Sequence, residues 1–418
     1  MKAKLRKILF WFHLLTGVVA GSIIAVLCIT GVALAFEKEL TSWAERGLRR
    51  IAVEPDSVPI SLDELPMLQD ESKSPTGNLE LSIHSDPRQG ILVSIGREFA
   101  HYVDPYSGEV LGQAASSMRT FMDVMLRMHR WLALSGDARN WGRAITGAAN
   151  AMFFLLALSG LYLWWPRRWN WKNLRPVLLF AGSKGKMRDW NWHHVIGFWT
   201  LPVVLVLTFT GMVISYPWLS QRLIQMAGDV ERARPDSVAL EPDSGGAPVD
   251  PDGPVVSGYH DAFRILAEAY PEWQTMQLRK GLPRRRGAPP PYRNGTTGEH
   301  GGPAGIAMPF SATIRERGAW PLFSSTQVVL DSHSGRVVQA SDYHDMSNGR
   351  KLRSWIRFLH TGEALGWPGQ LLAGVASAGG VVLVWTGFAL AWRRMVASIR
   401  RKRKGRVETP DDESCIRG

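Results

Sequence analysis

The chain has 418 residues, with 49 Lys and Arg against 37 Asp and Glu, for a net charge of +12. This length is enough for two or three domains. The two cysteines, Cys28 and Cys415, are too few for a disulfide framework, and the absence of C-x-x-C-H excludes c-type haem attachment by that motif. Mean hydropathy is near zero because long apolar runs alternate with polar stretches.

Four apolar runs carry no formal charge and are each long enough to cross a membrane, which takes ~20 helical residues for a ~30 Å core. They are residues 8–36, 144–165, 195–219 and 367–392. The first run is longer than the ~7–15 apolar residues of a secretory signal, so we expect an uncleaved anchor.

Basic residues predict which side of the membrane each connecting segment faces. Residues 166–190 hold seven Lys and Arg against one acid, and the tail 393–418 holds nine against four. By the positive-inside rule, residues 1–7, 166–194 and 393–418 are expected in the cytoplasm of a bacterium, below its inner membrane. The tail predicts contact with anionic membrane lipid, not with nucleic acid.

The two segments expected outside, residues 37–143 and 220–366, show similar patterns. Strand-like residues 91–95 and 99–103 lead into DPYSGEVLG, which is typical of a β-hairpin, and TQVVLDSHSGRVVQ (326–339) predicts a second one. Residues 260–273 have helical periodicity. We expect two small periplasmic α+β domains, with mobile loops at 231–256 and 281–305 that are rich in Pro, Gly and charge.

The apolar runs also repeat. WFHLLTG (11–17) aligns with NWHHVIG (191–197), and both runs reach Thr-Gly at the same offset. RMHRWLALSG (127–136) resembles RFLHTGEALG (357–366), and ALSGLYLWW (157–165) resembles VWTGFALAW (384–392). The predicted fold is an α-helical integral membrane protein with four transmembrane helices in two duplicated halves.

The repeat places the candidate histidines at two depths in the membrane, one near each face. His13 and His193, with His194 beside it, lie at the cytoplasmic ends of spans, whereas His129 and His360 precede spans on the periplasmic side. Ionisable residues within a membrane are costly and mark functional sites. The alternatives are interfacial histidines bonded to headgroups or carbonyls, or a copper site; zinc lacks enough ligands.

A b-type haem needs two axial ligands, which each pair supplies. Sidedness pairs His13 with His193 and His129 with His360, because one haem cannot bridge a ~30 Å core. His194 is the alternative to His193; adjacent helical residues point ~100° apart, so both should not bind one iron.

Two further groups of residues have both a functional and a structural interpretation. Four arginines near the outer histidines are candidates for pairing with haem propionates, or are interfacial charges whose stems lie along the membrane: Arg127, Arg130, Arg353 and Arg357. Small residues of spans one and four would admit a haem ring or allow close helix packing: Gly17, Gly21, Gly374, Ala376, Ala378, Gly379 and Gly380.

Together these motifs resemble the PepSY-associated transmembrane family over nearly the whole chain. DPYSGEVLG is similar to the family's repeated D-P-x-T-G-E-V-L pattern, whereas LDSHSGRVV lacks its proline. The family includes iron-regulated inner-membrane proteins and ferric-siderophore reductases. The resemblance implies four spans, two b-type haems and periplasmic PepSY-like domains.

The expected function is a dihaem b electron-transfer protein that reduces ferric siderophores at the periplasmic face and releases Fe(II). Its electrons would come from a quinol or a cytoplasmic reductase, since no G-x-G-x-x-G or Walker loop provides a nucleotide site. Two alternatives stay open: haem-based electron delivery to another periplasmic acceptor, and a non-enzymatic PepSY module that binds a protein partner.

Overall fold

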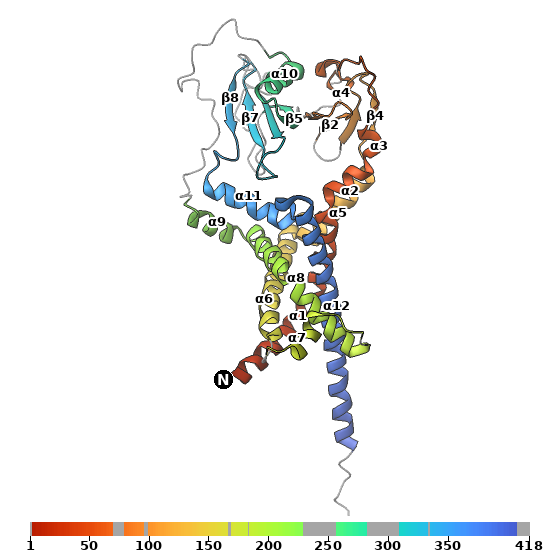
Figure 1. Ribbon diagram of the computed structural model, residues 1–418, viewed down its shortest axis with the longest axis vertical. Coiled ribbons are helices and arrows are strands. Elements are labelled where there is room, and N and C mark those ends of the chain that lie inside the picture. The colour runs from red at the N-terminus through yellow and green to blue at the C-terminus, as the bar shows by residue number, and fades with distance from the viewer. Residues whose placement is uncertain are drawn as a thin grey trace, which may run out of the picture. The chain divides into compact units, whose positions relative to one another are not determined.

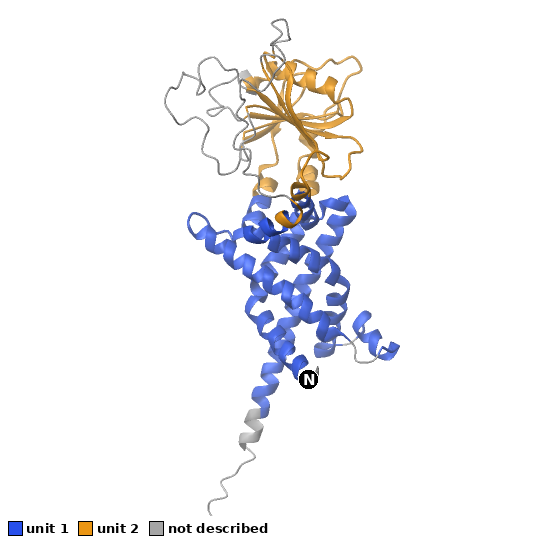
Figure 2. Cartoon of the chain, turned by 90° about the vertical axis from the view of Figure 1, so that its left-hand side faces the viewer, with its two compact units in different colours: residues 1–37, 121–224, 352–418 blue, residues 38–120, 225–351 orange. Residues whose placement is uncertain are grey.

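The computed structural model describes residues 2–69, 79–95, 99–165, 169–182, 184–228, 256–281, 309–332 and 335–407. The expected mobile loops, 231–256 and 281–305, lie almost entirely outside these residues. The chain divides into two compact units (Figures 1 and 2). Unit 1 comprises Met1–Glu37, Phe121–Ile224 and Leu352–Gly418, and unit 2 comprises Lys38–Thr120 and Gln225–Lys351.

Unit 1 is a bundle of four long helices. They are α1 (Lys2–Ala35), α6 (Ala138–Trp164), α8 (Gly185–Ser215) and α12 (Gly366–Val407). Each packs mainly against two others, in the cyclic order α1, α12, α8, α6. All four contain windows long and apolar enough to cross a membrane. The four expected spans are therefore confirmed as helices, although α8 begins well before residue 195, so that His193 lies within it.

Shorter helices of unit 1 lead into or follow the long ones. They are α5 (Ser116–Trp131), α7 (Trp171–Leu178), α9 (Pro217–Met226), α11 (Asn348–Thr361) and the 3-10 turn Glu363–Leu365; the first residues of α5 and α11 and the last two of α9 belong to unit 2. His129 lies in the last turn of α5, and His360 lies in the last turn of α11. Both histidines thus lie on helices separate from the spans that follow them.

Two glycines allow these histidine-bearing helices to approach the long helices closely. A Cβ on Gly142 of α6 would overlap the carbonyl oxygen of Trp131, and a Cβ on Gly369 of α12 would overlap that of Gly362. Trp131 and Gly362 each lie two residues after the histidine of their segment. The same backbone contact therefore fixes the end of α5 and the end of α11.

Unit 2 contains an eight-stranded antiparallel sheet in the order β4-β3-β2-β1-β5-β6-β7-β8. Its strands are β1 (Leu79–His84), β2 (Ile91–Ile95), β3 (Phe99–Val103), β4 (Val110–Gln113), β5 (Trp273–Lys280), β6 (Phe310–Glu316), β7 (Thr326–Leu330) and β8 (Val337–Ser341). The predicted hairpins are confirmed as β3–β4 and β7–β8.

The prediction of two separate outer domains is wrong. Strand β1 of the first outer segment pairs with β5 of the second, from Glu80 opposite Arg279 to His84 opposite Thr275. This pairing joins two four-stranded sheets at strands that would otherwise be exposed edges, which are open to unwanted pairing. One continuous sheet results.

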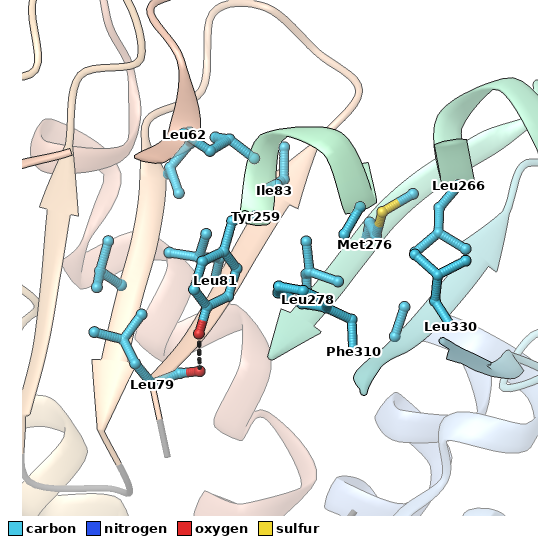
Figure 3. Packing of buried hydrophobic residues seen from close by; sticks show 14 of the residues in the cluster. Leu62, Leu79, Leu81, Ile83, Tyr259, Leu266, Met276, Leu278, Phe310 and Leu330 are labelled. Atoms are coloured by element: carbon cyan, nitrogen blue, oxygen red, sulfur yellow. Dashed lines mark hydrogen bonds between the residues drawn. The ribbon is translucent and has the colours of Figure 1, made fainter. Parts of the chain in front are cut away.

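The two outer segments also share one hydrophobic core (Figure 3). Leu81 of the first segment and Met276 and Leu278 of the second are fully buried on one face of the sheet. Helix α10 (Tyr259–Ala269) covers this face with Leu266, which is also fully buried. Since burying each such side chain contributes ~1.5–3 kcal/mol, neither segment would keep its share of the core alone.

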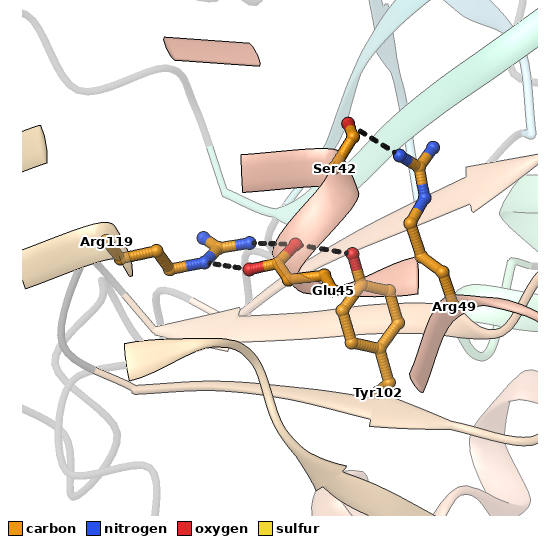
Figure 4. Close-up of polar contacts among 5 residues, drawn as sticks. All are labelled: Ser42, Glu45, Arg49, Tyr102 and Arg119. Carbon is orange, nitrogen blue, oxygen red and sulfur yellow. Dashed lines mark hydrogen bonds and ion pairs between the residues drawn. The ribbon is translucent and has the colours of Figure 1, made fainter. Parts of the chain in front are cut away.

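A buried carboxylate holds the first turn of α5 (Figure 4). Glu45, between α2 (Glu37–Ala44) and α3 (Arg46–Arg49), is 2% exposed and forms an ion pair with Arg119. The Tyr102 hydroxyl donates to its other oxygen at 2.9 Å. Burial, reinforced by Glu45, raises the pKa of the Tyr102 phenol, which keeps its proton for this bond. A buried charge is tolerated only with such partners.

Asp63 of the first outer segment caps α10 of the second, and its removal tests the shared fold. Its carboxylate accepts the backbone N–H groups of Tyr259 at 2.7 Å and His260 at 3.1 Å. Loss of a helix cap costs ~0.5–2 kcal/mol. Asp63→Ala should therefore speed amide hydrogen exchange in α10. Asp86→Ala, which removes an exposed carboxylate from a turn, is the control; equal exchange of α10 in both variants would contradict the capping role.

Candidate functional site

The structure brings the four candidate histidines together as two pairs. The rings of His13 (α1) and His193 (α8) have centroids 6.3 Å apart, and those of His129 (α5) and His360 (α11) are 6.2 Å apart. On α1, Thr30 contacts His129 and lies seventeen residues after His13, a rise of ~25 Å. The pairs therefore lie near opposite ends of the bundle.

Each histidine is hydrogen-bonded through Nδ1 to a hydroxyl on a neighbouring long helix. The four Nδ1–oxygen contacts are His13 to Ser159 (2.9 Å), His193 to Thr386 (2.9 Å), His129 to Thr30 (2.9 Å) and His360 to Thr210 (3.1 Å). These hydroxyl residues are at most 6% exposed. Four imidazoles from four helices thus share one local arrangement.

The hydroxyl hydrogens determine which ring nitrogen carries the proton. Each hydroxyl donates to the carbonyl oxygen four residues earlier in its own helix: Ser159 to Leu155, Thr386 to Val382, Thr30 to Val26 and Thr210 to Val206, at 2.7–2.8 Å. A hydroxyl has a single hydrogen, so its oxygen accepts from the histidine. Nδ1 therefore carries the proton, and a neutral ring keeps a lone pair on Nε2.

A second acceptor supports the same tautomer. For His360, Nδ1 also lies 3.0 Å from the carbonyl oxygen of Leu207, three residues before Thr210. Because a carbonyl oxygen only accepts, Nδ1 of His360 must donate.

A glycine follows every one of these hydroxyl residues and lies beside the ring. A Cβ on Gly31, Gly160, Gly211 or Gly387 would lie 3.1–3.8 Å from the Cε1 atom of its histidine. Only at Gly211, where this distance is 3.1 Å, would a Cβ crowd the ring, so the hydroxyl acceptor is the feature that all four dipeptides share. In the sequence, these dipeptides stood out only as markers of repetition.

The geometry of each pair suits one metal ion between two imidazoles. Two metal–nitrogen bonds of ~2.0 Å, with ~1.1 Å from each nitrogen to its ring centre, separate the centroids by ~6.2 Å. No hydrogen bond to the four Nε2 atoms occurs within the described residues. Burial lowers the pKa of His129 to about 4 and also lowers that of His360, which favours the neutral form of both rings.

Two protein ligands suit a metal that brings its remaining ligands with it. In the part of the chain that the structure describes, no three His, Cys, Asp or Glu side chains gather as a metal site. Haem iron has four ring nitrogens of its own and needs only axial ligands from the protein. The residues present therefore fit a haem better than a bare ion.

A family comparison covers nearly the whole chain. The family model described as the PepSY-associated TM region matches residues 10–394. The chain belongs to the PepSY-associated transmembrane family. With its four apolar helices, it is a multi-pass membrane protein. No curated protein matches the chain significantly.

His194 of this PepSY-associated protein is placed differently from His193. Its Nδ1 donates to the carbonyl oxygen of Trp190 at 2.8 Å, and its ring lies against the Trp190 indole, with centroids 4.2 Å apart. The ring that contacts His13 is that of His193. The structure thus favours His193 in the pair.

The candidate propionate partners have contacts of their own. Arg127 forms an ion pair with Asp123 at 3.1 Å, and Arg353 is exposed. The Arg130 guanidinium lies 4.7 Å from the Trp131 ring centroid, and that of Arg357 lies 5.3 Å from the Phe358 ring. Pairing of these arginines with a propionate stays a prediction.

Most of the glycines proposed as a slot for the ring pack against neighbouring helices instead. A Cβ on Gly21 would meet Phe388 at 2.6 Å, on Gly374 Phe36 at 2.7 Å, on Gly379 Thr200 at 2.7 Å and on Gly380 Cys28 at 2.5 Å. These close contacts are those of small residues at helix interfaces. The alternative interpretation, helix packing, therefore holds for these glycines.

No motif in the sequence singled out Asp189, which lies one turn before His193 on α8. Its carboxylate is completely buried and forms ion pairs with Arg188 at 2.9 Å and with Arg393 of α12 at 2.8 Å. The Arg188 guanidinium also lies 5.3 Å from the Trp385 ring. In the sequence, Asp189 stood out only as the one acid of a basic segment.

Proposed function

We propose that this protein binds two b-type haems, one between His13 and His193 and one between His129 and His360. The observation that carries the proposal is the ring spacing of 6.3 and 6.2 Å in pairs whose Nε2 atoms keep a lone pair. From here on, the inner pair is His13 with His193 and the outer pair is His129 with His360. These names follow the charge distribution, which puts the termini in the cytoplasm.

Duplication of one unit explains why two sites exist. The inner histidines, their hydroxyl partners and their glycines recur in both halves, and so do the outer ones. We infer that each half supplies one ligand to each haem. Each site then depends on both halves of the bundle.

The bound haems would supply one-electron chemistry, with a potential set by axial ligands and burial. The imidazoles of this chain would hold the iron, and the hydroxyls would orient the imidazoles. Sites separated by ~25 Å along α1 span most of a ~30 Å membrane core. The proposed activity is therefore electron transfer across the membrane, with a quinol or a cytoplasmic reductase as donor.

We further propose ferric siderophores as the acceptor at the outer face. Siderophore oxygens hold Fe(III) as a hard ion, and the softer Fe(II) has less preference for such ligands. Reduction would thus release the iron. This proposal is supported by the resemblance to the PepSY-associated transmembrane family, which includes ferric-siderophore reductases. Electron delivery to another periplasmic acceptor would use the same two haems.

Purified protein tests the proposal in two steps. We expect a b-type absorption spectrum with two haems per chain by the pyridine haemochrome assay. Mixing dithionite-reduced protein anaerobically with a panel of ferric chelates should reoxidise the haems and yield Fe(II), trapped by a ferrous chelator. Haem-free protein from haem-supplemented cells would refute the haem proposal and favour a PepSY binding module. Haem that no ferric chelate reoxidises would refute only the proposed acceptor.

A further inference from the structure

The hydroxyl groups that contact the histidines form a set with one shared geometry. In all four cases the hydroxyl hydrogen is donated to the carbonyl four residues earlier, and the oxygen accepts from Nδ1. All four oxygens lie within 3.1 Å of their Nδ1 atom. Each hydroxyl oxygen therefore accepts a hydrogen bond from Nδ1 of its histidine.

We propose that Ser159, Thr386, Thr30 and Thr210 are positioning residues that set the donor strength of the axial histidines and so the reduction potential of each haem. This inference rests on the proposed binding of two haems. A hydrogen bond from the distal N–H of a metal-bound imidazole makes the ligand more basic. A more basic ligand stabilises Fe(III) over Fe(II), which lowers the potential.

The Leu207 carbonyl beside Nδ1 of His360 lets the two effects of the Thr210 hydroxyl be separated. When Thr210 becomes valine, the Leu207 carbonyl still accepts from His360 at 3.0 Å. The ring then keeps its tautomer, and the haem should be retained. The lost hydroxyl bond should appear as a change in potential, not as a loss of cofactor.

Thr208 offers a closely matched control on the same helix. It is 2% exposed, and its hydroxyl donates to the carbonyl of Val204, four residues earlier, at 2.6 Å. This is the same intrahelical bond that Thr210 makes, but the hydroxyl does not contact a histidine. Thr208→Val therefore reproduces the loss of a buried threonine hydroxyl without changing a proposed ligand.

The test is a redox titration of the purified full-length protein, followed by absorbance at the haem bands. Thr210→Val and Thr30→Val should raise the midpoint potential of the outer haem, and Thr386→Val and Ser159→Ala that of the inner haem. Thr210→Ser should restore the original potential, and Thr208→Val should leave both unchanged.

Three results would overturn the inference. They are unchanged potentials in Thr210→Val, an equal shift in Thr208→Val, or loss of the outer haem from Thr210→Val while Thr208→Val keeps it. The last result would show that the Thr210 hydroxyl holds the His360 ring in place and does not set the potential of a bound haem. Failure of the haem proposal is seen earlier, because the unaltered protein would then give no haem spectrum to titrate.

Discussion

Replacing His360 with alanine should lower the haem content from two per chain to one. The variant loses one ligand of the outer pair, whose rings are 6.2 Å apart, whereas the inner pair lies ~25 Å away along the bundle. His129→Ala should give the same result. His13→Ala and His193→Ala should instead remove the inner haem, with the outer one retained. Pyridine haemochrome counting of the four purified variants checks this.

His194→Ala is the control for these variants. It removes a neighbouring imidazole that bonds to Trp190, so both haems should remain. Full haem content in all four paired-histidine variants would refute the ligand assignment. Loss of the inner haem from His194→Ala, but not from His193→Ala, would assign the inner ligand to His194 instead of His193.

Adding one methyl group at Gly369 or Gly142 should disrupt the outer site from a distance. An alanine Cβ at either position overlaps a backbone carbonyl oxygen, of Gly362 or Trp131, and a backbone atom cannot rotate away. The histidine-bearing helix must then separate from its span. We expect each variant to lose more than the ~1–3 kcal/mol typical of overpacking and to lose the outer haem before the inner one.

The measurement is thermal unfolding in detergent together with haem content. Gly182→Ala is the control, because a Cβ at this exposed glycine would meet no atom within 4 Å. A Gly369→Ala protein that melts like the unaltered chain and keeps both haems would show that the close approach of α12 is not required.

Patterns within short stretches of the sequence predicted the long helices and the hairpin turns, because these elements are determined by residues close together in the chain. The four apolar runs gave the four long helices, and Asp-x-x-x-Gly gave both hairpins, in which Gly108 and Gly335 have positive φ angles of 72° and 61°. The pairing of His13 with His193 also followed from sequence, because membrane sidedness restricts which residues can meet.

The features that were missed depend on contacts between distant segments. No pattern within β1 or β5 reveals that these two strands pair with each other, since every edge strand exposes similar backbone groups. The role of Ser159 beside His13 depends on how α1 packs against α6. Gly142 and Gly369 could be found only once the turns after α5 and α11 were seen.

The continuous sheet imposes an order on the synthesis of the protein. Strands β1 to β4 are made before α6 and α8, but their partner strand β5 begins only at Trp273, after both helices. At ~5–20 residues per second, the nascent chain spends roughly ten seconds or more with the β1 edge unpaired. During this interval the β1 edge is open to pairing with other chains, so a ribosome that stalls between α6 and β5 should leave a product more prone to aggregation than the complete protein.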